Sequence, residues 1–364
     1  MTIHYSMKRL LSLFLFFSSS IIYSQSNFTV SGKIVDSSSG EALASASVFC
    51  QNTTQGTASN KEGSFYLSLK EGGYDLIITY TGYKSQLIRI SPELKTHDLL
   101  ILLMKEEKSI EEVVIRSSNE VKDGWEKYGK FFLDNFIGTT PFSLQCSLQN
   151  PEVLKFYYFR KSDKLKVTAE KPLIIFNYAL GYNLRYNLDS FLFKYKTDIC
   201  SYTGYCFYEE MTGNLDSTIT WKNNREKAYL GSRLHFMQSY YDSTLIENGF
   251  ILELLDESDD TKFNKITDPY DTAYYNAVDS VEEKDIFFPR RISITYKKRA
   301  PENEYLKKYK LPVNISMQIS YIDMLDLISI KQNGYYYDQK DWINYGYWSW
   351  KNIADQVPND YVPE

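Results

Sequence analysis

The residues from Ser232 to Asp242 have the types and spacing from which a hydrolytic nucleophile could be built. Ser232, His235, Ser239 and Asp242 follow one another at offsets of three, four and three, so a helix would place them on one face. His235 would then lie within reach of a serine hydroxyl as its general base. The helix itself disfavours this chemistry, because its backbone N–H groups are already bonded and cannot stabilise an oxyanion. We therefore favour a polar helix edge over a catalytic dyad.

The sequence contains no metal or cofactor motif. Its three histidines, His4, His97 and His235, are not spaced with Cys or Glu as in zinc motifs. The acidic run 256–260 offers oxygen ligands for a hard cation but lacks the glycine-bearing loop of a dedicated calcium site. Gly-x-Ser-x-Gly elbows and phosphate-binding glycine loops are also missing. We expect no cofactor and no metal, and we interpret the acidic run as a solvated loop.

A dense group of aromatic side chains lies near the end of the chain. Aromatic residues make up 16% of the sequence, and Tyr alone supplies 32 residues. Strand alternation would bury only about half of such a group, and clustered exposed aromatics mark contact surfaces. Alternatively, these residues cover a small sheet and dock the C-terminal tail. The candidate binding surface comprises Tyr335, Tyr337, Trp342, Tyr345, Tyr347, Trp348 and Trp350.

The four cysteines differ in their surroundings. Cys50 and Cys146 are in phase with apolar neighbours and are expected to be buried thiols. Cys200 and Cys206 flank Ser-Tyr-Thr-Gly-Tyr, and a three-residue hairpin loop over 202–204 would place them opposite each other. Directly paired strand residues are within disulfide-forming distance. Cys200–Cys206 is therefore a candidate disulfide, with two free thiols as the alternative.

The first 24 residues have the features of a signal peptide. Lys8 and Arg9 precede an apolar stretch from Leu10 to Phe17, which is followed by small and polar residues. Cleavage after Ser24 would remove two of 41 basic residues and none of 46 acidic ones, changing the net charge from −5 to −7. An acidic balance without basic clusters disfavours nucleic-acid binding. No later apolar stretch is long enough for a transmembrane helix, so we expect an exported protein, periplasmic or associated with the outer membrane.

Residues 27–116 alternate apolar and polar side chains between glycines, which predicts short strands joined by tight turns. The pattern includes Gly32-x-Ile34-x-Asp36, Gly63-x-Phe65-x-Leu67 and Gly82-Tyr83. This region resembles the carboxypeptidase regulatory-like domain, a transthyretin-like β-sandwich of cell-envelope proteins. It is similar to the version that precedes TonB-dependent polysaccharide-uptake transporters, where a Glu-Glu-Val-Val run like that at 111–114 follows. The domain is an accessory part in metallocarboxypeptidases, so the resemblance implies no peptidase activity.

Two departures from that family pattern are visible. Residues 41–45 lack the usual Pro and Gly, and Ser59-Asn60 stands where Thr-Asp is common. Neither changes the predicted sandwich. The C-terminal part resembles uncharacterised envelope proteins with the same leading domain, through Asn-Phe-Ile-Gly-Thr-Thr at 135–140, Asn-Pro-Glu at 150–152 and Ala-Leu-Gly-Tyr at 179–182. No activity follows from that likeness.

Beyond the sandwich, the periodicity predicts a linker with an amphipathic helix over 117–138 and an α+β domain over 139–364. Gly138 is placed to end that helix, and a second helix is expected from an N-cap at Asn224 to Glu247, before Gly249. Strands are expected at 153–160, 164–170, 173–176, 182–196, 292–296, 313–321, 327–330 and 335–337. The fold class is therefore mainly β: a transthyretin-like sandwich, then an α+β domain with a mostly antiparallel sheet.

These observations favour a non-catalytic exported envelope protein that binds a partner protein or a glycan, within a system of surface nutrient uptake. The alternative is an envelope hydrolase acting on glycan through two carboxylates. Such pairs come from distant strands and leave no local spacing, so 46 acidic residues give no way to select them. Both functions remain open at this point.

Overall fold

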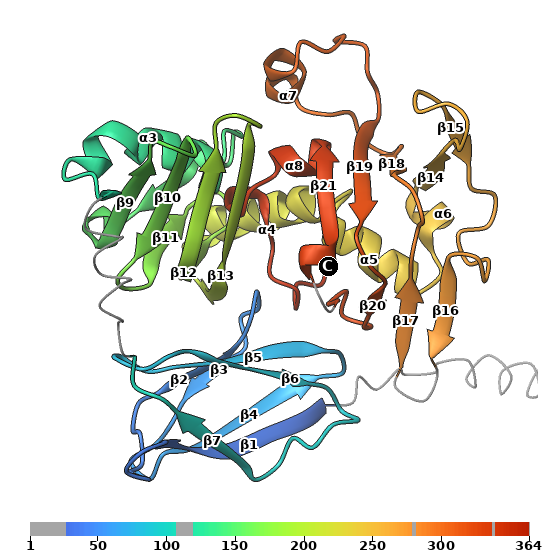
Figure 1. Cartoon of the computed structure of the whole chain (residues 1–364). Helices are drawn as coiled ribbons and strands as arrows, with labels where there is room; N and C mark the ends of the chain where they lie inside the picture. Colours follow the sequence, from blue (N-terminus) through green and yellow to red (C-terminus); the bar gives the residue numbers. More distant parts are fainter. Residues whose placement is uncertain (1–26, 107–118, 279–281, 337–338, 364) are drawn as a thin grey trace, which may run out of the picture.

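The computed structural model describes residues 27–106, 119–278, 282–336 and 339–363. The chain is mainly β, as predicted: a small N-terminal sandwich lies below a larger part in which helices accompany two larger sheets and a smaller third one (Figure 1). The expected signal segment, 1–24, lies outside the described residues, as does most of the linker. Within the described ranges, no helix has the length and apolar character needed to cross a membrane.

Seven short strands form the N-terminal sandwich. One sheet has the order β4-β1-β7, with β1 antiparallel to β4 and parallel to β7, and the other is antiparallel with the order β3-β2-β5-β6. Alternate residues face the space between the sheets, where Val30, Ile34, Leu76 and Ile78 are completely buried. The strands are β1 (Asn27–Asp36), β2 (Ser47–Cys50), β3 (Gly56–Ala58), β4 (Ser64–Lys70), β5 (Tyr74–Thr79), β6 (Gln86–Ile90) and β7 (Leu99–Leu103).

The glycine-punctuated pattern of the sandwich has a physical basis. The Tyr83 hydroxyl donates to Asp36 at 2.6 Å, and the Ser38 and Ser39 amides donate to the same carboxylate at 2.8 Å. These bonds hold the pKa of Asp36 well below its usual range. Gly63 has a φ of +77°, and a Cβ there would lie 2.5 Å from the Ile34 carbonyl oxygen, so a side chain is excluded. These turns thus tie β1 to its neighbours.

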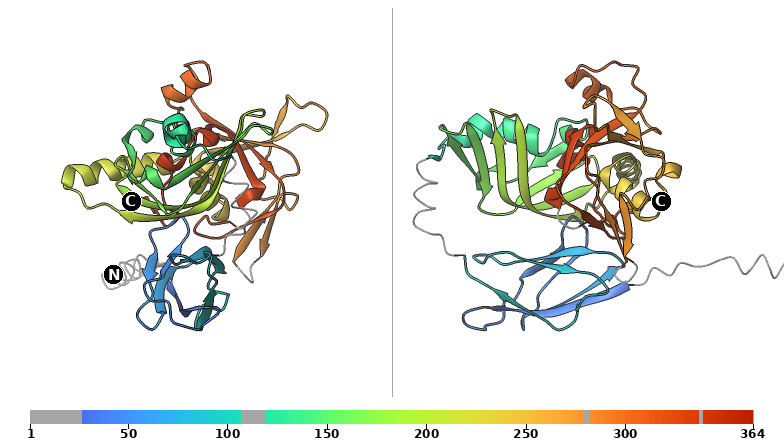
Figure 2. Two further views of the ribbon diagram at one scale, coloured as in Figure 1. Left: turned by 60° about the vertical axis from the view of Figure 1, so that its left-hand side comes forward. Right: turned by 45° about the vertical axis from the view of Figure 1, so that its right-hand side comes forward.

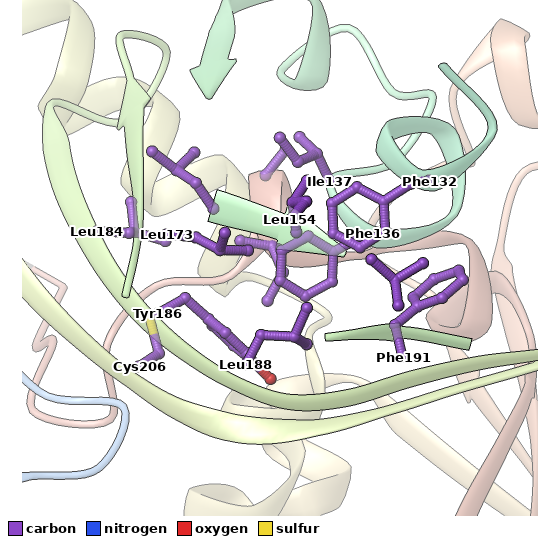
Figure 3. Packing of buried hydrophobic residues seen from close by; sticks show 14 of the residues in the cluster. Phe132, Phe136, Ile137, Leu154, Leu173, Leu184, Tyr186, Leu188, Phe191 and Cys206 are labelled. Carbon is purple, nitrogen blue, oxygen red and sulfur yellow. The ribbon is translucent and has the colours of Figure 1, made fainter. Parts of the chain in front are cut away.

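A six-stranded antiparallel sheet follows, with helix α3 (Gly124–Phe136) packed on one face. Phe132 and Phe136 of α3 lie over Leu173, Leu188 and Phe191 of the sheet (Figure 3). Gly138, with a φ of +117°, follows the helix as predicted. The sheet has the order β8-β11-β12-β10-β9, and β13 pairs with β12. Its strands are β8 (Cys146–Leu148), β9 (Leu154–Phe159), β10 (Lys164–Ala169), β11 (Leu173–Asn177), β12 (Tyr182–Lys194) and β13 (Ile199–Glu210).

The β12–β13 hairpin contradicts the candidate disulfide. Cys200 and Cys206 lie on the same strand, β13, opposite Phe193 and Tyr186 of β12, and both are free thiols. Six residues of extended strand separate them by about 20 Å, far beyond the reach of a disulfide. Gly204 does not form a turn, because it lies at an irregularity in the pairing with β12, where strand glycines commonly mark a bulge. The predicted loop at 202–204 is therefore wrong, and the chain turns at 195–198 instead.

Three helices replace the single helix predicted over 224–247. They are α4 (Leu215–Tyr229), α5 (Arg233–Tyr241) and α6 (Leu245–Asn248), and α4 begins after Asn214, which caps it through the Ser217 amide. Asn224 lies inside α4 and is not its cap. The helix breaks because Gly231 adopts a φ of +79° and Ser232 then caps α5. The predicted C-terminal stop at Gly249 is confirmed by its φ of +94°.

The last part of the chain builds a second antiparallel sheet, β15-β14-β18-β19-β21, and a smaller one, β16-β17-β20. Figure 1 shows α4 and α5 in yellow extending from the first sheet to this second one. Their strands are β14 (Phe250–Leu255), β15 (Phe263–Lys265), β16 (Tyr275–Val278), β17 (Glu283–Ile286), β18 (Ile292–Tyr296), β19 (Gln318–Met324), β20 (Ile328–Ile330) and β21 (Trp342–Gly346). The remaining helices are α7 (Asn303–Lys308), α8 (Tyr347–Trp350) and the short 3-10 turns η1 (Ser143–Gln145), η2 (Pro151–Val153), η4 (Gln339–Asp341) and η5 (Ile353–Asp355).

The loop between β2 and β3 connects the sandwich to the rest of the molecule. The Asn52 amide donates to the Cys206 carbonyl at 2.7 Å, and the Tyr208 amide donates to the Thr53 carbonyl at 3.0 Å, so the loop pairs with the free edge of β13. Both views in Figure 2 show the sandwich below the larger part, on the side where this loop meets it. Asp360 near the C-terminus accepts from Thr54 and from Gln55. The sandwich is thus joined to both β13 and the C-terminal tail.

Candidate functional site

The aromatic group near the C-terminus does not form an exposed patch. Tyr345 alone is substantially exposed among the described members, at 40%, because it is the strand residue that faces outward. Tyr337 lies outside the described residues. The other predicted members are 8% exposed or less, and they are Tyr335, Trp342, Tyr347, Trp348 and Trp350. Most of the expected contact surface is therefore interior, which corrects the prediction of exposure.

Several of these buried aromatics instead line a cavity of about 440 Å³ between the two sheets. Its walls come from β13, from the junction of α4 and α5, from β21 with α8, and from the tail after α8. Tyr335, Tyr336, Trp342, Tyr347 and Trp348 all contribute. A cavity of this size, with aromatic walls and a few polar groups, is typical of small-molecule sites. We take it as the candidate functional site.

The break between α4 and α5 helps to shape this cavity. Gly231 and Ser232 at the break are part of the lining. A Cβ at Gly231 would lie 2.5 Å from the Tyr296 ring, so the close packing there requires glycine. The Trp348 indole N–H donates to the Gly231 carbonyl at 2.7 Å, which fixes one aromatic wall against the break. A continuous helix would not leave this carbonyl available.

The sandwich and the C-terminal tail complete the lining. Asn52 from the β2–β3 loop and Asn359 from the tail both lie on the cavity wall, and the Asn359 amide donates to the Asn52 carbonyl at 2.7 Å. Cys200 also lines the cavity, whereas Cys206 lies inside the core between α3 and the six-stranded sheet (Figure 3). The site is therefore assembled from segments that are far apart in the sequence.

A lysine joins two carboxylates beside the cavity. The Lys351 ammonium lies 2.8 Å from Glu302 and 3.1 Å from Asp355. The Thr140 hydroxyl donates to the other carboxylate oxygen of Asp355, and the Tyr347 hydroxyl donates to the other carboxylate oxygen of Glu302. Burial raises the pKa of Asp355 against the opposing effect of Lys351, whereas Lys351 lowers the pKa of Glu302 in spite of burial. This network attaches the C-terminal tail to α7 and to the segment after α3.

Opposite pKa shifts in two nearby carboxyl groups are what acid–base catalysis requires. A glycosidase also needs room for the sugar and water between its carboxyl groups. In this network the Lys351 ammonium lies between Glu302 and Asp355, and all four carboxylate oxygens accept hydrogen bonds. The arrangement is therefore better suited to holding the tail than to hydrolysis.

The serine–histidine set identified in the sequence has structural roles. The Ser232 hydroxyl accepts from the His235 amide as the helix cap, and the Ser239 hydroxyl donates to the His235 carbonyl at 2.6 Å. The His235 ring accepts at Nδ1 from the Gly231 amide at 3.1 Å. Burial lowers the pKa of His235 to about 4. Neither serine hydroxyl bonds to the imidazole among the described residues, so the set forms no catalytic dyad there.

The acidic run near 256–260 remains on the surface. Asp256 accepts from Ser258 and Asn264, and Asp259 accepts from Thr261, so these carboxylates stabilise their own turns. Across the described ranges, no group of three or more His, Cys, Asp or Glu side chains is arranged to hold a metal ion. The interpretation of a solvated loop agrees with these turn contacts.

The cavity also contains a charged residue that no sequence pattern identified. Tyr336, which belongs to the same run of tyrosines as Tyr335, lines the cavity beside it, and Arg233 projects from the first turn of α5. Arg233 lies directly after Ser232, the residue considered as a nucleophile, but no spacing pattern identified the arginine itself. Its position depends on the helix break at Gly231, which the continuous helical periodicity concealed.

Comparison with known families supports the identification of the N-terminal domain. Residues 30–115 match the family model described as CarboxypepD_reg-like domain, which confirms the resemblance seen in the sequence. The match ends before α3, so most of the cavity lies outside the matched region. A search of curated proteins found no match for the chain. The likeness to the polysaccharide-transporter version of the domain stays a prediction.

Proposed function

We propose that this chain, which carries a CarboxypepD_reg-like domain, is a non-catalytic exported protein of the cell envelope that binds the end of a glycan in the cavity. The observation that carries the proposal is the cavity of about 440 Å³ with seven aromatic side chains in its wall, Tyr202 and Tyr208 of β13 among them. Aromatic rings provide large apolar faces, and the flat faces of sugar rings are complementary to them. The volume suits one or two sugar units by comparison with ordinary ligand pockets.

The envelope assignment rests on two features of the N-terminal region. CarboxypepD_reg-like domains are typical of envelope proteins, and residues 1–24 have the composition of a signal peptide. A role in surface nutrient uptake is consistent with both. We expect the purified native protein to begin at or near Gln25 and to fractionate with the periplasm or outer membrane. A native N-terminus at Met1 in the cytoplasmic fraction would contradict this assignment.

Ligand binding can be tested through the tryptophans of the cavity. The full chain is titrated with disaccharides of glucose, galactose and mannose and with their uronic-acid counterparts, while tryptophan emission is recorded. We expect a saturable change with at least one of them, and Trp348→Phe should reduce its amplitude because Trp348 lines the cavity. Trp221→Phe is the matched control, since Trp221 on α4 is not part of the lining.

The same samples separate binding from hydrolysis. Incubation with each disaccharide is followed by measurement of new reducing ends. Binding without new reducing ends supports the proposed function, whereas turnover that is lost in Glu302→Gln would favour the hydrolase. Absence of any emission change or heat of binding across the whole panel would refute glycan binding in this cavity.

A further inference from the structure

The cavity lining carries a positive charge in an acidic protein. Among the described residues, its charged side chains are four cations, Lys227, Arg233, Lys340 and Lys351, and one carboxylate, Asp355, a balance of +3. The whole chain has a net charge of −5. Asp355 and Lys351 bind each other, which leaves the other three cations as the charge available to a ligand. A cleft with one sign of charge concentrates ligands of the opposite sign.

Arg233 is the most enclosed of the three remaining cations. Its side chain is partly buried, whereas Lys227 and Lys340 are exposed at the cavity rim. The guanidinium carbon of Arg233 lies 5.6 Å from the centre of the Tyr336 ring. Burial raises the pKa of Tyr202, and the positive charge of Arg233 lowers it in part. None of the ion pairs found in the described part of the chain includes Arg233. Its five N–H donors are therefore free of carboxylate partners there.

A second, independent feature at the same place is an unbonded buried hydroxyl. Tyr336 is 3% exposed and lines the cavity, and its hydroxyl makes no hydrogen bond within the described residues. Buried polar groups almost always have partners, so this hydroxyl is suited to a ligand oxygen. The first turn of α5, a nine-residue helix, also faces the cavity through Ser232, Arg233 and Leu234. The amides of a first helical turn favour an anion.

We propose that the ligand is an acidic sugar, whose carboxylate binds the Arg233 guanidinium and whose ring lies against the aromatic wall. The inference rests on the proposed glycan-binding function and specifies its ligand class. A planar carboxylate matches the paired N–H donors of a guanidinium, and such bidentate contacts are strong and directional. Tyr336 donates to a further oxygen of the same sugar. Neutral sugars satisfy the aromatic wall but leave Arg233 without a partner.

Calorimetric titration of the full chain tests this ligand class. The probes are the disaccharides of galacturonic and glucuronic acid, their neutral galactose and glucose counterparts, and sodium acetate. We expect the uronates to bind at least about tenfold more tightly than the neutral sugars, as a charge-assisted hydrogen bond implies. Acetate should bind more weakly than either uronate because it lacks the ring. Equal affinity for acidic and neutral disaccharides would overturn the inference while leaving glycan binding intact.

Variants of Arg233 locate the contact. Arg233→Met should weaken uronate binding by about tenfold to a hundredfold and neutral-sugar binding by a much smaller factor, and Arg233→Lys should recover part of the loss. Arg160→Met is the control, since Arg160 is an exposed residue of the turn after β9 and makes the same change in charge. Unfolding midpoints confirm that each variant is folded. Uronate affinity that is equal in wild type, Arg233→Met and Arg233→Lys would refute the role of Arg233, and binding of no sugar at all would refute the proposed function.

Discussion

Replacing Tyr336 by Phe would remove one oxygen atom from the cavity wall. The Tyr336 hydroxyl is buried and has no hydrogen-bond partner in the described structure. A hydroxyl buried without a partner destabilises a folded protein by about 1–3 kcal/mol relative to an apolar group of the same shape. Because Phe keeps the ring and its packing against Trp342, we expect Tyr336→Phe to raise the free energy of unfolding by about 1–2 kcal/mol.

Tyr240→Phe is the matched control for this prediction. Tyr240 lies in the same hydrophobic core and is completely buried, but its hydroxyl donates to the Pro269 carbonyl. Removing that donor leaves a buried acceptor unpaired, so the free energy of unfolding should fall by about 1–2 kcal/mol. The same chemical change is therefore expected to have opposite signs at the two tyrosines.

The assay is thermal unfolding of ligand-free protein, followed by near-UV circular dichroism of the aromatic core. For a unit of this size, 1 kcal/mol shifts the midpoint by about 2–4 °C. The transition should rise by a few degrees in Tyr336→Phe and fall by a similar amount in Tyr240→Phe. A fall of similar size in both variants would show that the Tyr336 hydroxyl has a structural partner, and the reasoning about a ligand oxygen would then fail.

Two further predictions concern stability and domain contact. Burial lowers the pKa of His235 from its ordinary 6.5 to about 4. As the pH falls, the imidazole is therefore protonated in the unfolded chain before it is protonated in the folded one. The free energy of unfolding should fall by up to about 3 kcal/mol between pH 6.5 and 4. Denaturant titrations across that range should show a smaller loss of unfolding free energy in His235→Asn than in the wild type. The exposed control His97→Asn should lose as much as the wild type. An equal loss in His235→Asn and the wild type would show that other groups cause it. Asp360→Ala removes the acceptor for the β2–β3 loop, so amide exchange in residues 51–55 should accelerate while α3 is unaffected. Unchanged exchange there would show that the main-chain contacts with β13 hold the loop by themselves.

Local patterns were sufficient where one face of a strand or helix is buried. The alternation in Leu165 and Val167 predicted β10, and the four strands expected between 153 and 196 are present. The apolar face of α3 and the stop at Gly138 were also recognisable, since both depend on residues within a few positions. The N-terminal sandwich was predictable for the same reason, because its turn glycines are needed by backbone conformations and contacts within the domain.

Local patterns failed where a glycine permitted two conformations. The sequence predicts Gly204 in a hairpin loop, but the long strand β12 continues past it, and pairing along that strand places Gly204 inside β13. Helical periodicity predicts that Gly231 lies within a helix, but the close approach of Tyr296 and Trp348 requires the break there. In both cases the deciding contact comes from a residue that is far away in the sequence.

The candidate site illustrates the same division. The sequence identified an aromatic cluster with Trp342, Tyr347 and Trp348, but not which side of each ring would be covered. Alternation predicts exposure for about half of a strand's residues only when one face meets solvent. Here α5 and the C-terminal tail cover the aromatic cluster, so side chains that were expected at the surface line a cavity instead.

Composition and short-range periodicity were enough to predict the mainly β class, the sandwich with its turns, the amphipathic α3 and the abundance of aromatic residues. Long-range packing places Cys200 and Cys206 about 20 Å apart on one strand. The same packing brings Arg233 and Tyr336 together in one cavity. These positions depend on how two sheets, a broken helix and the tail pack together, and that packing leaves no signal at any single spacing in the sequence.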